Sequence, residues 1–251
     1  MKKTNSRLIC AFGAILMVGA VRGSVIINDP TMAAADYSLP GYNAALGIGP
    51  AGTMTAASLG AGGNPGSYRL SNYTAPATPA FNVSYFSEFN VSTTWNPSVT
   101  PISTVAMGLD TFSVDVDGSG NFAVLFAVRQ GGNVYTNFVY HTVPNTAWNL
   151  YTSALLTQSS FQLTGSPGNN PNFSATGGIV EFGFEFDATL SNRPSAIFGY
   201  QADNFCVAVN GGSCAGTSRI PTPEPASWAL VILPLGMIGW RRLRKGRVAI
   251  V

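Results

Sequence analysis

The sequence predicts an all-β fold, an antiparallel β-sandwich of the jelly-roll type, for residues 24–216. Short runs of β-branched and aromatic residues alternate with turn signals at intervals of about ten residues. Helical hydrophobic periodicity is scarce, whereas Gly, Ser, Thr and Asn are abundant. A body of about 200 residues is a plausible size for one β domain. We expect a signal helix before this domain and a transmembrane helix after it.

Residues 1–23 predict a secretory signal peptide. The segment has a basic start, then an apolar run, then two small residues before the cleavage point. These three parts are Lys2, Lys3 and Arg7, then Leu8–Ala20, then Val21 and Gly23. We expect signal peptidase to cut after Gly23, so that the rest of the chain enters an export compartment.

The clearest strand pattern lies between residues 106 and 142. A β-branched segment leads to an Asp-Gly turn at 117–120, and the apolar run Phe122–Val128 follows. A Gly-Gly turn at 130–133 then leads into Val134–His141. Short turns of this kind predict an antiparallel meander of three strands. The nearly unbroken apolar run predicts a central strand that is covered on both faces.

Two further strands are expected near the end of the domain. Residues 179–186 alternate strictly, with Val180 and three phenylalanines on one face and Glu181 and Glu185 on the other. Phe198–Val209 supplies the last strand. The one short helix of the domain is expected within Ser153–Leu163.

The charge of the domain excludes nucleic-acid binding. The whole chain has a formal charge of +2, but residues 24–220 contain four arginines, no lysine and ten acidic residues, which gives −6. The basic charge therefore belongs to the two ends of the chain. A body so poor in cations has no electrostatic footprint for a phosphate backbone.

Two cysteines remain once the signal peptide is removed, and they are close in sequence. Cys206 and Cys214 flank an Asn-Gly-Gly turn signal at 210–212. In an oxidising export compartment this spacing predicts a disulfide that closes a short loop. Metal binding is the weaker alternative, because the chain has only one histidine and no further cysteine outside the signal peptide.

Two short strings resemble elements of jelly-roll modules of the carbohydrate-binding and laminin-like type. They are Gly62-Gly-Asn-Pro-Gly-Ser-Tyr68 and Asp203-Asn-Phe205. The resemblance implies a structural calcium ion at Asp203 and Asn204, completed by Asp29 or Asp36 because first and last strands are often neighbours in such sandwiches. The alternative is that Asp203 and Asn204 shape a turn or cap the strand.

A second calcium candidate, Asp115 to Asn121, is weaker. In a calcium loop of the EF-hand type, the position that needs a bidentate glutamate falls on Val124. An Asp-Gly turn between two strands explains the same residues.

The only enzyme-like arrangement is Glu181 with Glu185. The string resembles the Glu-x-Asp-x-Glu pattern of laminarinase-like sandwich hydrolases, although Gly183 replaces the central Asp. Positions i and i+4 of a strand lie about 13 Å apart at Cα. Because a retaining glycosidase needs its two carboxyl groups about 5.5 Å apart, we interpret the pair as solvated glutamates on the outer face of a sheet. His141, the only histidine, lacks a nucleophile motif nearby.

Four aromatic residues are candidates for stacking on sugar rings or for packing in the core, and the sequence leaves both open. They are Trp95, Tyr135, Trp148 and Tyr151.

The C-terminal residues predict delivery to a membrane. A proline-containing linker (217–225) leads to an uncharged apolar segment (226–240) and a basic tail (241–251). As a helix, the apolar segment reaches about 22 Å, which is shorter than a hydrocarbon core of about 30 Å. Terminal tryptophans and the following cations relieve that mismatch and predict a cytoplasmic tail. The basic residues are Arg241, Arg242, Arg244 and Lys245.

Pro223-Glu224-Pro225, the apolar segment and the arginine-rich end together resemble the PEP-CTERM sorting signal of Gram-negative bacteria that produce exopolysaccharide. The resemblance implies an exosortase-type processing enzyme and transient anchoring in the inner membrane, followed by release to the cell surface or the extracellular matrix.

The expected function is therefore that of an exported, non-enzymatic protein that binds polysaccharide, such as exopolysaccharide, or neighbouring proteins. The alternatives are a sandwich glycoside hydrolase that uses Glu181 and Glu185, and a purely structural matrix subunit.

Overall fold

The computed structural model describes residues 24–38, 41–47, 53–64, 66–74, 82–114, 121–143, 147–164, 168–190 and 197–214. The predicted signal peptide, the linker with Pro223, Glu224 and Pro225, the apolar segment and the basic tail lie outside these residues, as does most of the Asp115–Asn121 string. Within the described ranges, no helix is long and apolar enough to cross a membrane.

Two antiparallel sheets confirm the predicted β-sandwich. The strands are β1 (Ser24–Asp29), β2 (Gly41–Gly47), β3 (Thr53–Gly63), β4 (Gly66–Thr74), β5 (Asn82–Trp95), β6 (Val105–Val114), β7 (Asn121–Gln130), β8 (Asn133–Thr136), β9 (His141–Thr142), β10 (Asn149–Thr152), β11 (Gln162–Leu163), β12 (Val180–Leu190) and β13 (Ile197–Val209). One sheet has six strands, in the order β10-β6-β13-β4-β3 with β1 also paired to β13. The other has seven, in the order β11-β8-β7-β12-β5-β2 with β9 also paired to β7.

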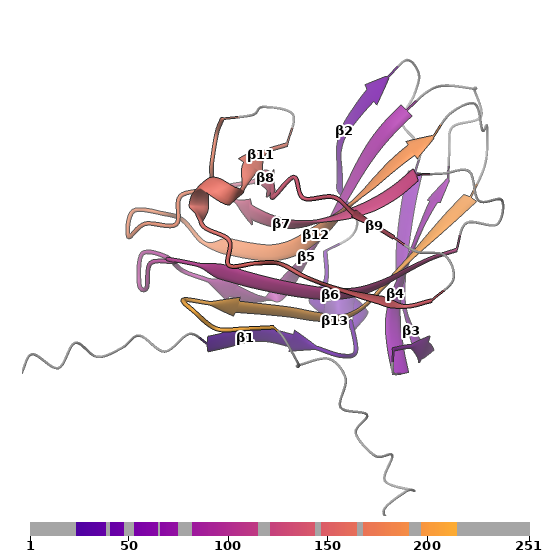
Figure 1. The fold of residues 1–251 in the computed structure, drawn as a ribbon, viewed down its shortest axis with the longest axis horizontal. Coiled ribbons are helices and arrows are strands. Elements are labelled where there is room, and N and C mark those ends of the chain that lie inside the picture. The colour runs from indigo at the N-terminus through magenta and orange to yellow at the C-terminus, as the bar shows by residue number, and fades with distance from the viewer. Residues whose placement is uncertain are drawn as a thin grey trace, which may run out of the picture.

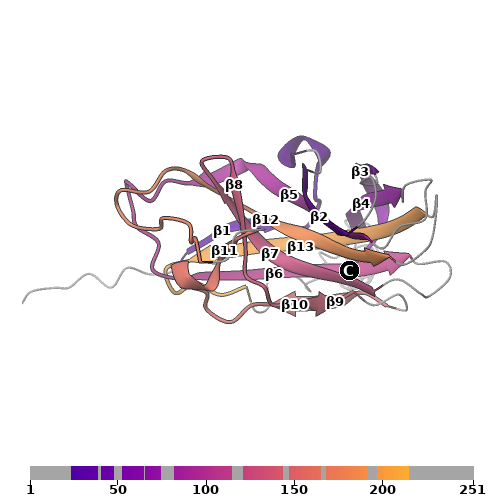
Figure 2. The same cartoon turned by 90° about the horizontal axis from the view of Figure 1, so that it is seen from above.

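The two sheets pack face to face around one hydrophobic core. Figure 1 shows β1, β13 and β6 in one layer and β5, β12 and β7 in the other. In Figure 2 the long strands of both layers run in nearly the same direction, which is the aligned packing of a sandwich. The largest fully buried side chains are Tyr73, Tyr200, Phe86, Phe89, Phe126, Phe161, Phe173, Phe182, Phe184, Phe186 and Phe205.

Strand periodicity was a sound guide to the core. Val180, Phe182, Phe184 and Phe186 of β12 all face the other sheet and are fully buried, as their alternation predicts. Strand β7 lies between β12 and β8 and is buried from residue 124 to residue 128, so the prediction of a central strand covered on both faces is confirmed.

The predicted three-stranded meander is wrong in its first pair. Strands β6 and β7 are consecutive in the sequence, but β6 belongs to the six-stranded sheet and β7 to the seven-stranded sheet. Only β7 and β8 form the expected hairpin, with Gln130 opposite Asn133. Alternation shows which residues of a strand face the core, and it is the same whichever sheet the strand joins.

Two local predictions also need correction. The strand expected at 134–141 is broken, because β8 ends at Thr136 and the chain returns to β7 only at His141. The helix expected within Ser153–Leu163 is reduced to a single 3-10 turn, η2 (Gln158–Ser160). Another 3-10 turn, η1 (Ala34–Asp36), follows β1.

Strand β13 changes partners halfway along its length. Its first half pairs with β4 up to Ala202, opposite Arg69, and its second half pairs with β1 from Phe205, opposite Asp29. On its other side β13 pairs with β6 throughout, with a bulge between Asp203 and Cys206. The first and last strands are therefore neighbours, and Asp203 and Asn204 stand where one partner ends and the other begins.

A buried ion pair joins the two sheets through the core. Arg69 of β4 donates to Glu88 of β5, and both side chains are almost wholly buried. Ser71 also donates to Glu88, and the guanidinium of Arg69 lies 5.3 Å from the ring centre of Tyr37. Burial raises the pKa of Glu88, and the charge of Arg69 opposes that shift. Arg69 therefore has a structural role in the core.

Candidate functional site

The seven-stranded sheet presents a second, outward-pointing set of side chains, and we call this side of the sheet the outer face. On β12 the set comprises Glu181, Gly183, Glu185 and Asp187, which alternate with the core-facing residues. Residues directly opposite each other in an antiparallel sheet share a face. Asp187 lies opposite Tyr85 of β5 and Ala123 of β7, so both belong to the outer face.

The predicted solvated glutamates are wrong for one of the two residues. Glu185 is only 1% exposed although it points away from the core. Glu181 is partly exposed, and its carboxylate accepts a hydrogen bond from Arg129. One group near Glu185 is Tyr140, and the strand pattern cannot place it because residues 137–140 leave the sheet between β8 and β9.

Tyr140 belongs to that segment and reaches the carboxylates of β12. Its hydroxyl and that of Tyr85 are hydrogen bonded to each other. Burial and then the charge of Asp187 raise the pKa of both phenols, and Glu185 adds to the shift. Two tyrosines from separate elements therefore lie beside the two acidic groups of the outer face.

Asp187 is the least satisfied of these groups. Its side chain is 8% exposed, and its Oδ1 atom is buried without a hydrogen-bond partner among the residues that the structure describes. Burial raises the pKa of Asp187 from 3.8 to about 6. Most buried polar atoms in folded proteins have a partner, so an open carboxylate beside tyrosines is a candidate acceptor for a ligand.

Arg129 is the described cation on this face, and it is paired with a carboxylate. It donates to Glu181, and its guanidinium lies 4.7 Å from the ring centre of Phe89. The Phe89 ring in turn lies against Gly183, where an added Cβ would be 2.7 Å from Cδ1 of that ring. Only glycine permits this approach of β5 to β12, and the result is a closed Glu181–Arg129–Phe89 stack.

The last three residues of the 137–140 segment are large, mostly apolar and exposed. Phe138, Val139 and Tyr140 are 38%, 51% and 48% exposed. Phe138 has a φ of +50°, which is uncommon for a residue with a Cβ. Unusual backbone conformations of this kind cluster at ligand sites, where the surrounding structure maintains them.

The geometry does not favour the glycosidase alternative. Strand β12 keeps an unbroken register with β7 from Val180 to Thr189, so it has no bulge that brings Glu181 and Glu185 together. The irregularity lies in the partner strand β5, between Asn90 and Thr94. Glu181 is also held by Arg129, which keeps it away from a nucleophile's role.

A second acidic cluster lies on the opposite side of the molecule, on the outward side of the six-stranded sheet. Asp110 of β6 and Asp203 of β13 are directly opposite each other, and both are 0% exposed. Asn64 and Asn204 donate to Asp110 through their side-chain amides, at 3.3 and 2.8 Å. The backbone amides of the same two asparagines donate to Asp203, at 2.5 and 2.7 Å. Burial raises the pKa of Asp203 to about 7.

This cluster joins the two strings that were singled out in the sequence. The side chain of Asn204 donates to the carbonyl of Asn64, so the turn between β3 and β4 is held against β13. An added Cβ at Gly63 would lie 2.5 Å from Oδ2 of Asp203, so this position requires glycine. Asn204 itself has a φ of +52°, a conformation that asparagine tolerates better than most residues.

The calcium set expected from the sequence is not assembled as expected. Asp203 and Asn204 meet Asp110 and Asn64, whereas Asp36 accepts a hydrogen bond from Ser92, at 2.5 Å. Asp29 ends β1 with a turn, and its Oδ1 accepts hydrogen bonds from the backbone of Thr31 and Met32. Among the described residues, no three His, Cys, Asp or Glu side chains are grouped to hold a metal ion. Calcium binding therefore stays a prediction.

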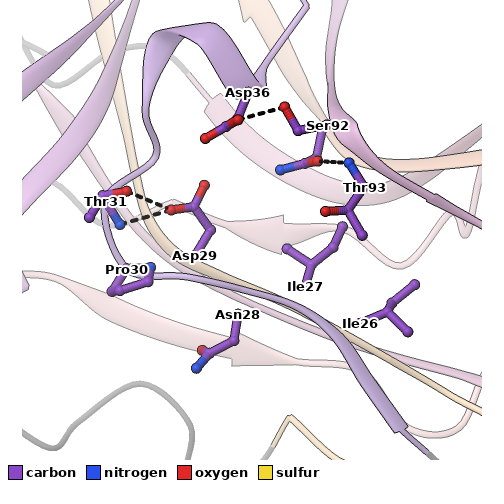
Figure 3. Close-up of a pocket in the computed structure, with 10 residues that line it drawn as sticks. Ile26, Ile27, Asn28, Asp29, Pro30, Thr31, Asp36, Ser92 and Thr93 are labelled. Atoms are coloured by element: carbon purple, nitrogen blue, oxygen red, sulfur yellow. Dashed lines mark hydrogen bonds between the residues drawn. The ribbon is translucent and has the colours of Figure 1, made fainter.

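Asp29 and Asp36 instead line a polar cavity of about 360 Å³ between the end of β1 and the irregular part of β5. Figure 3 shows Asp36 bonded to Ser92 on one side and Asp29 bonded to Thr31 on another. The Oδ2 atom of Asp29 is buried and accepts no hydrogen bond from the described residues.

The other predicted site residues have structural roles. Cys206 and Cys214 form a disulfide, with Cα atoms 5.8 Å apart, that packs against Ala106 and Ala208 on the outward side of the six-stranded sheet. His141 packs against Phe126 and Tyr151, with ring centres 5.8 and 4.7 Å apart, and burial lowers its pKa.

The four aromatic candidates do not gather on the outer face. Tyr135 is in the core, and Trp95 donates to the carbonyl of Thr100, at 2.7 Å. Trp148 lies 5.9 Å from the ring centres of Tyr68 and Phe112. The aromatic residues that do reach the outer-face carboxylates, Tyr85 and Tyr140, were missed. No motif marks them, because they meet only through the return of the 137–140 segment.

No protein-family model matches the sequence, and no curated protein matches it. The resemblance of the tail to a sorting signal therefore has no support from a family model. Among solved structures, the neighbours include carbohydrate-binding modules of β-sandwich type. They also include an exo-β-agarase, which is 11% identical, with a TM-score of 0.42 over 77% of this chain and 26% of that chain.

One neighbour is a structure of carbohydrate-binding modules from the β-sandwich superfamily with promiscuous specificity. It is 7% identical, with a TM-score of 0.39 over 68% of this chain and 56% of that chain, so the match spans little more than half of its length. The CBM22-1 xylan-binding domain from Paenibacillus barcinonensis Xyn10C is 10% identical, with a TM-score of 0.38 over 76% and 97% of the two chains.

A third neighbour, the mannan-recognising module TmCBM27, is 9% identical, with a TM-score of 0.38 over 75% and 98% of the two chains. Each of these TM-scores is below 0.5, so the ligands of these modules do not transfer to this chain.

Proposed function

We propose that this chain is an exported, non-catalytic module that binds polysaccharide at the part of the outer face where Asp187, Tyr85 and Tyr140 meet. The observation that carries the proposal is Asp187, which is more than nine-tenths buried and lies beside Tyr85 and Tyr140, and whose Oδ1 has no partner within the described part of the chain. Leaving a buried acceptor open costs free energy, and a sugar hydroxyl can donate to it. Tyrosine rings supply flat apolar surfaces on which a sugar ring can pack.

Binding fits this face better than hydrolysis. Glu181 is occupied by Arg129, and regular pairing of β12 keeps Glu181 and Glu185 apart. We therefore expect no turnover of polysaccharide. Hydrolysis of a β-glucan by the wild-type protein, abolished in Glu185→Gln, would contradict this part of the proposal.

The test of binding compares two tyrosines on opposite sheets. Tyr140→Ala removes a half-exposed ring from the outer face, and Tyr68→Ala removes a partly buried ring next to Trp148 on the other sheet. We expect Tyr140→Ala to weaken retention on immobilised glycans by about tenfold, which corresponds to about 1.4 kcal/mol. Tyr68→Ala should retain wild-type affinity.

Equal losses for the two variants would contradict the placement of the site. A wild-type protein that binds no xylan, mannan or β-glucan in affinity electrophoresis, but associates with itself, would favour the alternative of a structural matrix subunit.

Export is the second part of the proposal. The disulfide between Cys206 and Cys214 supports it, because such bonds persist mainly in oxidising compartments. We propose removal of residues 1–23 by signal peptidase and later release of the C-terminal segment by an exosortase-type enzyme. The intact mass of the protein from culture supernatant tests both steps. A mass that ends between residues 221 and 227 is expected, and one that retains Arg241 and Arg242 would show an anchored protein instead.

A structural calcium ion is a further proposal for the Asp110–Asp203 cluster. Two buried carboxylates face each other there, and the carbonyl of Asn64 and the side chain of Asn204 add oxygen atoms of the kind that calcium prefers. Asp110 and Asn64 would take the place that the sequence assigned to Asp36. Calcium in excess should raise the melting temperature by roughly 5 to 10 °C relative to EDTA. Asp203→Asn should lose that response, and an unchanged wild-type melting temperature would refute the site.

A further inference from the structure

We infer that the outer face selects uncharged glycans and rejects polyanionic ones. This inference rests on the proposed function, since it concerns the ligand class of the same site. The charged groups that the structure places on the outer face are Glu181, Glu185, Asp187 and Arg129. The formal charge of this set is −2 when all three carboxylates are ionised.

The one described cation on the outer face is already paired with a carboxylate. The described residues contain two arginines and no lysine. Arg69 is 2% exposed and paired with Glu88 in the core. Arg129 is 30% exposed, its Nε donates to Glu181 and its guanidinium lies over the ring of Phe89, so its positive charge is balanced by an adjacent carboxylate.

Recognition of sulfate or carboxylate groups on a glycan needs cations in excess of the local carboxylates, and this face has the opposite balance. Such groups are acceptors, and proteins bind them with the forked donors of arginine or with lysine. Neutral sugars instead offer hydroxyl donors, which match the carboxylate acceptor Asp187. Because Glu185 and Asp187 are buried, solvent and salt screen their repulsion of an incoming anion less than they would at an exposed site.

Charge selection therefore has two sources. The only described cation of the face is already paired with Glu181, and the face contains carboxylates that repel anions, which is how specificity against a wrong ligand is commonly achieved. The domain as a whole adds to this, since residues 24–220 have a formal charge of −6. A polyanion meets an unfavourable field before it reaches the site.

The experiment compares each neutral glycan with its own charged derivative. The full-length protein is tested at about pH 7.5, where Asp187 is ionised, against xylan, mannan and β-glucan, and against carboxymethylated forms of the same three polymers. We expect retention of at least one neutral polymer and at least tenfold weaker retention of its carboxymethylated form. Added salt should narrow the difference, because it screens repulsion between the protein and the polymer.

Two variants with the same change in charge locate the effect. Glu181→Gln removes one negative charge from the outer face and releases Arg129, whereas Thr55→Lys adds one positive charge on exposed β3 of the other sheet. We expect Glu181→Gln to reduce the preference for the neutral polymer at least threefold. Thr55→Lys should leave the preference within twofold of wild type.

The outcomes separate the inference from the proposed function. Binding of a neutral polymer together with equal or tighter binding of its charged form would overturn charge selection and leave polysaccharide binding intact. Equal effects of the two variants would show that net charge, not this face, sets the preference, and would also overturn it. Failure to bind any of the six polymers would overturn the proposed function itself.

Discussion

The two outward-facing sides of the sandwich each contain a buried aspartate, and the two aspartates differ in their hydrogen bonds. On the six-stranded sheet, Asp203 accepts hydrogen bonds from the backbone amides of Asn64 and Asn204. On the seven-stranded sheet, Oδ1 of Asp187 is buried and has no hydrogen-bond partner among the described residues. Asp203 holds a turn against a strand and so supports the fold, whereas one oxygen of Asp187 is left without a described donor. Whether a buried carboxylate is structural or functional is thus decided by its neighbours.

The largest expected effect on stability concerns the disulfide on the outward side of the six-stranded sheet. Replacing both Cys206 and Cys214 with alanine opens a loop with a sequence separation of 8. The chain-entropy model gives a loss of about 2.5 kcal/mol in the free energy of unfolding for such a loop. Urea denaturation measures this loss, and glycan affinity should stay within twofold of wild type. Loss of glycan affinity together with retained stability would contradict the assignment of stability to the six-stranded side and of binding to the seven-stranded side.

Asn204 is expected to have the next largest effect. Without its side-chain amide, Asp110 and the carbonyl of Asn64 each lose a hydrogen bond. We expect Asn204→Ala to lower the free energy of unfolding in EDTA by about 2 kcal/mol.

Asn204→Gly serves as the control for this variant, because glycine adopts the positive φ of this position without strain. The loss in Asn204→Gly reports the hydrogen bonds, and the extra loss in Asn204→Ala reports backbone strain. Full stability of the glycine variant would show that the amide contributes nothing.

Asp187 should give the smallest effect on stability and one of opposite sign. Burial raises its folded-state pKa to about 6, above its ordinary value of 3.8. The folded protein therefore holds this proton more tightly than the unfolded chain, so stability falls as the pH rises through the interval between these values and is level above it. Asp187→Asn should remove that slope and raise the melting temperature at pH 7. A thermal-shift series from about pH 4 to pH 8 measures both.

Asp187 is also expected to make glycan affinity depend on pH. If the ionised carboxylate accepts a sugar hydroxyl, the affinity of the wild-type protein for a neutral glycan should fall as the pH drops below about 6. Asp187→Asn should bind more weakly at pH 7 and show a flat pH profile. Higher stability together with weaker glycan binding is the result expected if Asp187 serves binding at a cost in stability. Unchanged affinity would show that Asp187 does not contact the glycan.

Sequence alone was enough for the layers of the fold. Alternation along β12 places Phe182, Phe184 and Phe186 in the core, because side chains of a strand point to opposite faces with a period of two. The same alternation does not predict which strands pair with each other. The predicted pairing of β6 with β7 failed because both strands bury one face in a common core, whichever sheet they join.

For the sites, the sequence by itself determined which groups are acidic, that cations are scarce and that two cysteines are close. Tertiary structure decided what those groups do. The turn at Asn64 reaches Asp203 across 139 positions of the chain, and Tyr140 reaches Tyr85 from a segment that leaves the sheet. Contacts between residues so distant in sequence depend on how the strands are ordered in each sheet. Local periodicity contains no information about that order. The partnered Asp203 and the open Asp187 therefore look alike in the sequence and differ only in the folded protein.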